Sequence, residues 1–203
     1  MLEKRVFLKT TIFNTPVLSK LFHYLATFLL WLNGWRVDGR LPDIPKFILI
    51  AAPHTSNWDF LLFLGIVFRL QANVRFMGKA ELFRWPYDWF FYWCGGTPVN
   101  RSKSQGLVEQ MVKACNESEK FILTIAPEGT RHFVREWKMG FYHIAKTSGI
   151  PLVMAKVDGK HKAVRVGETF YPTDNMEADI KAIKGAFSGM EGIHPERKYI
   201  TLE

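Results

Sequence analysis

Three short, nearly continuous apolar runs constrain the fold of this chain more than any other feature of its sequence. They occupy residues 47–52, 121–125 and 152–157. Runs of this length are typical of strands that are buried on both faces of a sheet. Because successive parallel strands need a crossover connection, usually a helix, we expect helices in the sequence between these runs.

Helical and extended patterns alternate along the rest of the chain. We expect helices at residues 57–70, 81–93, 107–119, 139–148 and 174–187. We expect further extended segments at residues 74–77, 97–100 and 163–170, whereas residues 37–45 are polar and turn-rich. The alternation predicts an α/β fold, a single-domain α/β sandwich in which helices flank a largely parallel or mixed central sheet.

The N-terminal part of the chain contains a further apolar segment. Residues 17–34 are expected to form a helix, and their apolar core at residues 21–32 is shorter than a membrane span of about 20 residues. This segment fits a buried core helix. It also fits a helix lying in one leaflet of a membrane, with Trp31 and Trp35 at the lipid headgroups. We favour the membrane-associating helix because the segment is apolar almost throughout.

The composition favours an anionic partner. The chain has a formal net charge of +8 and 15% aromatic residues. Both properties suit a membrane surface, although charge alone also fits a nucleic acid or a phosphorylated substrate. The two cysteines, Cys94 and Cys115, form no CxxC pair, and the six histidines show no zinc-binding spacing. We therefore expect free thiols, no metal and no cofactor.

A histidine and an aspartate follow the first apolar run directly. His54 and Asp59 are separated by four residues where the expected strand ends and the next helix begins. Taken alone, this spacing is typical of a helix cap, with Ser56 as the N-cap residue. The catalytic interpretation is that Asp59 accepts a hydrogen bond from His54 Nδ1 and leaves Nε2 as a base for an alcohol proton. A serine nucleophile is not indicated, because no Gly-x-Ser-x-Gly sequence occurs.

A turn with two opposite charges follows the second apolar run. Its sequence is Pro127-Glu128-Gly129-Thr130-Arg131. On the surface, Glu128 and Arg131 would form a solvated charge pair that contributes little. At a binding site, Arg131 can hold a phosphate through two hydrogen bonds, and Glu128 can accept hydrogen bonds from substrate hydroxyls.

Four sequence blocks, in this order, resemble the glycerophospholipid acyltransferase superfamily, in particular bacterial 1-acylglycerol-3-phosphate acyltransferases. The pair His54-x4-Asp59 is similar to the first motif, and Gly96-x-x-Val99-x-Arg101 to the second. The block from Pro127 to Arg131 is similar to the third motif, and Ile150-Pro151-Leu152-Val153 to the fourth. Lys79 is similar to a lysine that precedes the family's aromatic segment. The resemblance spans residues 45–160. It leads us to divide the chain into a membrane-associating helical segment at residues 1–35 and an acyltransferase domain at residues 36–203.

Three residues depart from the common pattern of this superfamily. Pro53 stands where asparagine is common, Ala126 where phenylalanine is common, and His132 where serine is common. All three lie beside the motifs and leave the motif residues themselves unchanged. They bear on the identity of the acceptor rather than on acyl transfer.

The resemblance implies transfer of a fatty acyl group from an acyl-CoA or acyl-ACP thioester to a hydroxyl. It implies that His54 is the general base and that Asp59 orients it. The implied substrate-binding residues are Lys79, Arg101, Glu128, Gly129, Thr130 and Arg131. Two arginines favour a phosphate on the acceptor, so 1-acylglycerol 3-phosphate is expected, with glycerol 3-phosphate and other lysolipids, including phosphate-free ones, as alternatives. A lipid acceptor implies a peripheral or monotopic location at the cytoplasmic face of a membrane.

Two interpretations of other classes compete with an enzyme. A basic nucleic-acid-binding protein fits the charge, but the basic residues are scattered and no known nucleic-acid-binding motif is present. A lipid-binding protein without catalysis is disfavoured because His54, Asp59, Glu128 and Arg131 are all present. The expected partners are an anionic membrane surface, the acyl-CoA or acyl carrier protein thioester and a lysophospholipid, with no nucleic acid.

Overall fold

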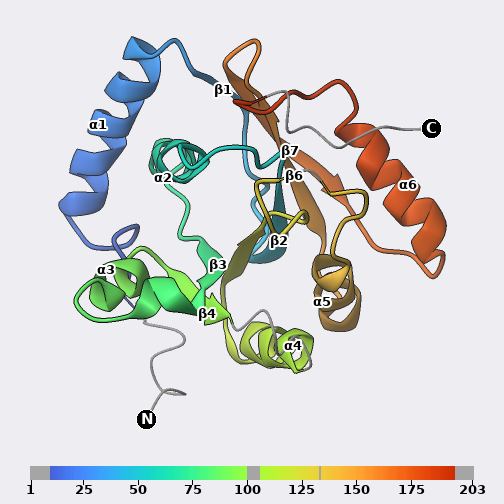
Figure 1. Cartoon of the computed structure of the whole chain (residues 1–203). Helices are drawn as coiled ribbons and strands as arrows, with labels where there is room; N and C mark the ends of the chain where they lie inside the picture. The colour runs from blue at the N-terminus through green and yellow to red at the C-terminus, as the bar shows by residue number, and fades with distance from the viewer. Residues whose placement is uncertain (1–9, 100–105, 133, 195–203) are drawn as a thin grey trace.

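A mixed sheet forms the centre of the molecule (Figure 1). The computed structural model describes residues 10–99, 106–132 and 134–194. Within these residues, seven strands form one sheet in the order β1-β7-β6-β2-β5-β3-β4. Strands β6, β2, β5, β3 and β4 run parallel to one another, whereas β7 and β1 run in the opposite direction. The predicted single-domain α/β sandwich with a largely parallel or mixed sheet is confirmed.

Most elements lie close to their expected positions. The strands are β1 (Arg36–Gly39), β2 (Lys46–Ala52), β3 (Arg75–Lys79), β4 (Gly96–Val99), β5 (Phe121–Ile125), β6 (Leu152–Asp158) and β7 (Ala163–Phe170). The helices are α1 (Leu18–Leu32), α2 (Asp59–Arg69), the 3-10 helix η2 (Ala80–Phe83), α3 (Asp88–Trp93), α4 (Leu107–Glu117), α5 (Gly140–Ser148) and α6 (Met176–Ala186).

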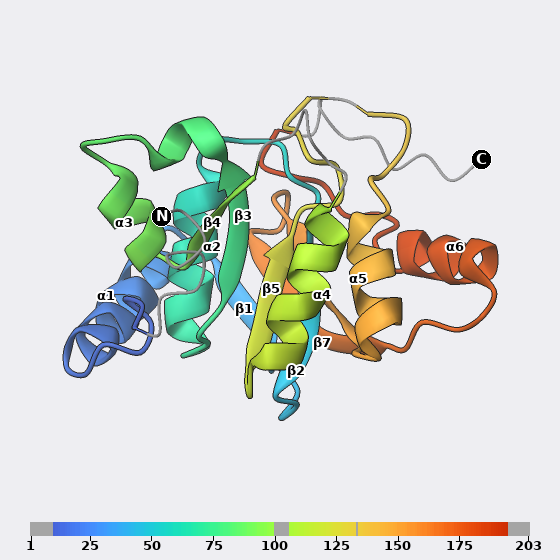
Figure 2. The ribbon, with the colours of Figure 1, turned by 90° about the horizontal axis from the view of Figure 1, so that it is seen from below.

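Helices cover both faces of the sheet. Figure 2 shows α2, with α1 outside it, on one side, and α4, α5 and α6 on the other. Within β2, Ile48 and Ile50 pack in the core beneath α4, α5 and α6, whereas Phe47 and Leu49 pack with Ile66 of α2. Successive side chains of a strand point to opposite faces, so β2 is buried on both sides. This double burial explains why its sequence is apolar without alternation.

Strand β1 is not predicted by the sequence pattern. Its residues fall at the start of the segment that was expected to be turn-rich. Three of the four residues of β1 are exposed, so the strand carries no clear apolar pattern. It pairs along the sheet edge with β7, from Arg36 opposite Ala163 to Gly39 opposite Val166. A distant partner therefore decides that this polar segment is extended.

The helix expected at residues 81–93 is wrong in its extent. After η2 ends, the backbone of Arg84 is extended, and α3 begins only at Asp88. Pro86 lies in this break. Proline has no N–H to donate and disfavours helical backbone at the residue before it, which explains the interruption. The stretch therefore forms two short helical segments.

Helix α1 forms an outer layer on α2. Its Ala26 and Leu30 are buried, and Leu30 lies against Gly65 of α2, where a Cβ would meet Leu30 Cδ2 at 3.5 Å. The outer side of α1 carries exposed apolar side chains: Leu21, Tyr24, Leu25, Phe28, Leu29, Trp31 and Leu32. In the part of the chain that the structure describes, no helix is long and apolar enough to cross a membrane. The division at residues 35 and 36 stays a prediction.

Candidate active site

Two loops that carry motif residues meet at one edge of the sheet. Strands β2 and β5 are neighbours and run parallel, with Ile50 opposite Ile125. The loop after β2 leads to α2 and the loop after β5 leads to α5, and these two helices cover opposite faces (Figure 2). Open α/β sheets bind their ligands at the carboxyl ends of adjacent parallel strands whose connections diverge in this way.

His54 and Asp59 are in contact, as the sequence predicted. His54 Nδ1 lies 2.8 Å from Asp59 Oδ2, and the two side chains are 25% and 11% exposed. An ionised carboxylate only accepts hydrogen bonds, so this contact favours a proton on Nδ1, and in the neutral imidazole the other ring nitrogen, Nε2, then has the lone pair. The pair thus holds an imidazole in the tautomer that a general base needs.

Asp59 also closes the turn at the start of α2. Its Oδ2 accepts the backbone N–H of Thr55 at 2.7 Å and that of Ser56 at 2.8 Å. A carboxylate at the first residue of a helix also interacts favourably with the helix dipole. The expected N-cap residue is wrong by two positions, because Trp58 rather than Ser56 occupies it. Asp59 therefore caps the turn and orients His54 at the same time, because a single carboxylate oxygen makes both sets of contacts.

Glu128 joins the loop after β5 to the loop after β2. Its side chain is 1% exposed, and its Oε1 accepts the backbone N–H of His54 at 3.3 Å. Gly129 has a positive φ of 66°, which side-chain-bearing residues disfavour. Its N–H donates to Ala126 O at 3.1 Å and closes the turn. Glu128 is therefore not part of a solvated surface charge pair.

Two of the three expected cations, Lys79 and Arg131, lie in the described part of the chain. Lys79 is the exposed last residue of β3, which pairs with β5. Arg131 is exposed, and no carboxylate of the described residues lies within 4.0 Å of its guanidinium. Thr130 Oγ1, between the turn and the loop that follows, accepts the backbone N–H of His132 at 3.4 Å. Arg101 lies outside the described residues.

Comparison with sequence families agrees with this geometry. A family model described as Acyltransferase matches residues 39–156, which is more than half of the chain and includes both loops of the site. The chain belongs to the acyltransferase family. A comparison with curated proteins found no match.

The fold of this acyltransferase is similar to that of a solved protein. The crystal structure of the 1-acyl-sn-glycerophosphate (LPA) acyltransferase PlsC from Thermotoga maritima matches it with a TM-score of 0.63 and 21% sequence identity. The match covers 84% of this chain and 76% of that chain. At this identity the likeness concerns the fold.

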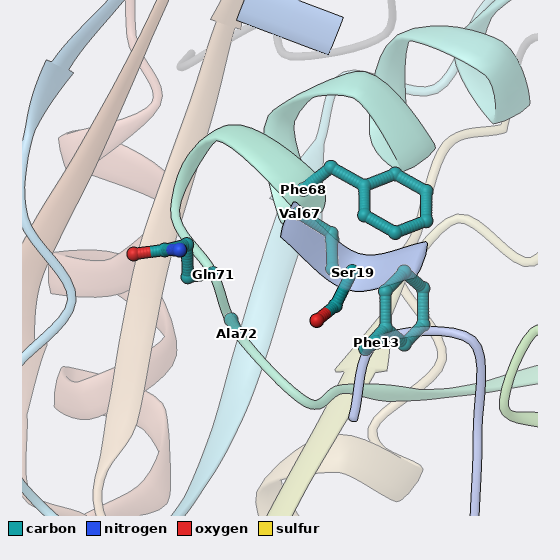
Figure 3. A pocket seen from close by; sticks show the side chains of 6 residues that line it. All are labelled: Phe13, Ser19, Val67, Phe68, Gln71 and Ala72. Carbon is teal, nitrogen blue, oxygen red and sulfur yellow. The ribbon is translucent and has the colours of Figure 1, made fainter. Parts of the chain in front are cut away.

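A small cavity in the acyltransferase lies away from His54. It has a volume of about 40 Å³ and is lined by Phe13, Ser19, Val67, Phe68, Gln71 and Ala72 (Figure 3). Val67 follows Asp59 by eight residues on α2, which corresponds to about 12 Å along the helix axis. A space of this size holds at most a few water molecules. The cavity is thus too small and too distant to be the substrate site.

Two contacts of the site are not evident from the sequence. The first is the hydrogen bond from the backbone N–H of Thr55 to Asp59. A backbone donor is not indicated by the type of residue at that position. The second involves Lys138, whose N–H donates to Pro127 O at 2.8 Å, and whose Cδ lies 3.0 Å from the position of a Cβ on Gly129. The only signal for Lys138 is its place beside the buried Trp137.

The described residues contain no group of three or more His, Cys, Asp or Glu side chains placed to hold a metal ion.

Proposed function

We propose that this acyltransferase moves a fatty acyl group from an acyl-CoA or acyl-ACP thioester to the free hydroxyl of 1-acylglycerol 3-phosphate, giving phosphatidic acid. The observation that carries the proposal is the 2.8 Å contact between His54 Nδ1 and Asp59 Oδ2 beside the Glu128 turn. The similar fold of PlsC, whose name states this acceptor, supports the choice of acceptor.

His54 acts as the general base in this proposal. Nε2 takes the proton of the acceptor hydroxyl while the hydroxyl oxygen forms a bond to the thioester carbonyl carbon. The carbon–sulfur bond then breaks, and the leaving thiolate takes the proton from the imidazolium, so that the products are an ester and a free thiol. Asp59 stabilises the imidazolium between these two steps. The reaction needs neither a protein nucleophile nor a cofactor.

The cations at this edge of the sheet bind the acceptor phosphate. Arg131 presents two parallel N–H groups that match a phosphate, and no described carboxylate competes for it. Lys79, at the end of β3, supplies a second charge at the same sheet edge. Arg101 joins this set through the motif that it shares with the superfamily. Glu128 and its turn position the glycerol part of the acceptor.

A lipid acceptor requires a surface that meets the membrane, and we assign it to α1 and the η2–α3 region. The outer side chains of α1 are apolar and exposed, as are Leu82, Trp85, Tyr87 and Trp89. Both views place α1 and α3 at the same end of the molecule (Figures 1 and 2). With 15 residues, α1 is about 22 Å long. This length suits a helix that lies in one leaflet, here the cytoplasmic leaflet of an anionic membrane.

Product identification tests the reaction. Purified protein is incubated with palmitoyl-CoA or palmitoyl-ACP and, separately, 1-acylglycerol 3-phosphate, glycerol 3-phosphate or monoacylglycerol, and the products are identified by mass spectrometry. Phosphatidic acid as the main product of the first acceptor supports the proposal. If another acceptor gives the main product, the acceptor named in the proposal is wrong, but the assignment of acyl transfer stands. No product from any pair would contradict the catalytic assignment.

The base assignment is tested by His54→Ala, which is expected to lower kcat by about 10²–10⁴-fold, the usual contribution of a general base. His161→Ala is the matched control. His161 Nδ1 also lies 2.9 Å from a carboxylate oxygen, that of Asp158, but its side chain is 60% exposed. Asp59→Asn is expected to lower kcat as well, because an amide can donate to Nδ1 and favour the wrong tautomer. Near-normal turnover of a folded His54→Ala protein would exclude His54 as the base.

A further inference from the structure

The segment that follows α6 turns back onto the loop that carries His54. This post-α6 segment comprises residues 190–194. It accepts the backbone N–H of Gly159, from the β6–β7 turn, on Glu191 O at 2.5 Å. It donates the backbone N–H of His194 to Thr55 Oγ1 at 3.1 Å. The segment is therefore hydrogen-bonded to two loops, and one of them lies between β2 and α2.

Gly192 lies at the closest point of this packing. A Cβ on Gly192 would lie 2.3 Å from Thr55 Oγ1 and 2.6 Å from Thr55 Cγ2, closer than real Cβ atoms approach. A Cβ on Gly159 would lie 2.5 Å from Gly192 O. The described glycines with a positive φ do not include Gly192. Space, rather than backbone conformation, therefore excludes a side chain at this position.

Thr55 connects this packing to the His54–Asp59 pair. It is fully buried and follows His54 directly in the chain. Its backbone N–H donates to Asp59 Oδ2 at 2.7 Å, and the same oxygen lies 2.8 Å from His54 Nδ1. A displacement of Thr55 therefore moves a donor that holds Asp59 and the main chain next to His54.

We propose that Gly192 and Thr55 are positioning residues for the His54–Asp59 pair, held in place by the post-α6 segment. The inference rests on the proposed function, in which His54 is the base. A methyl group at Gly192 reaches ordinary van der Waals distance only if Thr55 or the segment shifts by about 1 Å, and a misplacement of this size at a catalytic group can lower the rate by roughly 10²-fold.

Gly192→Ala is the first test. We expect kcat to fall by about 10- to 100-fold, whereas KM for the acceptor changes by less than about twofold, because the substitution moves the base and not the binding cations. Gly185→Ala on α6 is the matched control, since a Cβ there meets nothing within 4 Å, and it should keep the wild-type kcat. Thermal unfolding establishes that both variants are folded. An unchanged kcat in folded Gly192→Ala, or an effect on KM alone, would overturn the inference.

A second substitution tests whether Thr55 transmits the effect. Thr55→Ala removes Oγ1 and Cγ2, the two atoms nearest to the added methyl group. We expect the double variant to have a higher kcat than the product of the two single effects predicts, because the clash is relieved. Effects that simply multiply would exclude Thr55 as the connection.

If Gly192→Ala does not fold, Thr55→Val tests the same link by removing the acceptor of the His194 N–H. A wild-type kcat for that variant would contradict the inference.

A measurement without substrates separates this inference from the proposed function. ¹⁵N-histidine NMR reports which ring nitrogen of His54 carries the proton, and the His54→Ala protein assigns the signal. We expect the Nδ1–H tautomer in the wild type and a mixture of tautomers in Gly192→Ala. An unchanged tautomer in Gly192→Ala overturns the positioning role. A changed tautomer in a protein that acylates no lysolipid supports the positioning role and contradicts only the proposed reaction.

Discussion

The backbone N–H of His54 donates to Glu128 Oε1 across 3.3 Å, although the two residues are 74 positions apart in the chain. The contact exists because β2 and β5 are adjacent and parallel, so their following loops meet at one edge. It places a nearly fully buried carboxylate beside the main chain of the proposed base. The geometry of the base therefore depends on both loops.

Substitutions of Glu128 should show whether its side chain holds the loop of His54 in place. Glu128→Ala is expected to destabilise the fold by about 1–3 kcal/mol, because the His54 N–H loses a buried acceptor. Glu128→Gln keeps an oxygen at that position and should retain most of the stability and of kcat, because the His54 N–H keeps its acceptor. Denaturant unfolding and steady-state kinetics measure the two effects. Equal losses of stability in both variants would contradict the role of Oε1 as an acceptor.

Removal of Arg131 should weaken binding of a phosphorylated acceptor selectively. Arg131→Ala is expected to raise KM for 1-acylglycerol 3-phosphate by about 10- to 100-fold, since hydrogen bonds to charged groups contribute about 1.5–3 kcal/mol. Arg131→Lys should recover part of this loss, because lysine keeps the charge but not the paired donors. Arg135→Ala, another exposed arginine nearby, is the control. An equal change of KM for phosphate-free monoacylglycerol would rule out Arg131 as the phosphate ligand.

Charges on the outer side of α1 should reduce membrane binding. Phe28 and Trp31 are 53% and 72% exposed. The double change to glutamate is expected to lower binding to vesicles of phosphatidylglycerol and phosphatidylcholine by at least about tenfold, because each buried apolar side chain contributes about 1.5–3 kcal/mol. Vesicle flotation measures the bound fraction. Tyr171→Glu is the control, because Tyr171 is also a largely exposed aromatic residue but follows β7. Unchanged binding of the α1 variant would remove α1 from the membrane surface.

Asp179 should make stability depend on pH in acid. Burial opposes its ionisation, but hydrogen bonds from Thr173 N–H, Thr173 Oγ1 and Tyr142 OH at 2.5, 2.8 and 2.8 Å outweigh burial and hold the pKa of Asp179 below its ordinary value of 3.8. Because the folded pKa is the lower one, this stabilisation is complete above the unfolded pKa and is lost as the pH falls through the folded pKa. Urea unfolding between about pH 6 and 2 should show this loss in the wild type. A similar pH dependence in Asp179→Asn would exclude Asp179 as its source.

Parts of the fold that depend on local pattern were predictable from the sequence. β2 and β5 are buried on both faces, so their continuous apolar runs identify them without knowledge of their partners. β1 was missed because it is exposed and its strand conformation depends on pairing with β7. In the aromatic stretch before β4, hydrophobic content predicted one helix, but the backbone restriction at Pro86 separates η2 from α3.

The sequence by itself indicates the candidate site residues, because His54 lies five residues before Asp59, and Glu128 three before Arg131, directly after apolar strands. How the two loops meet depends on the packing of distant elements. Strand order brings Glu128 to the backbone of His54. Gly192, from the far end of the described chain, packs against Thr55. Contacts between residues distant in sequence depend on how strands pair and loops pack, and local spacing does not encode them.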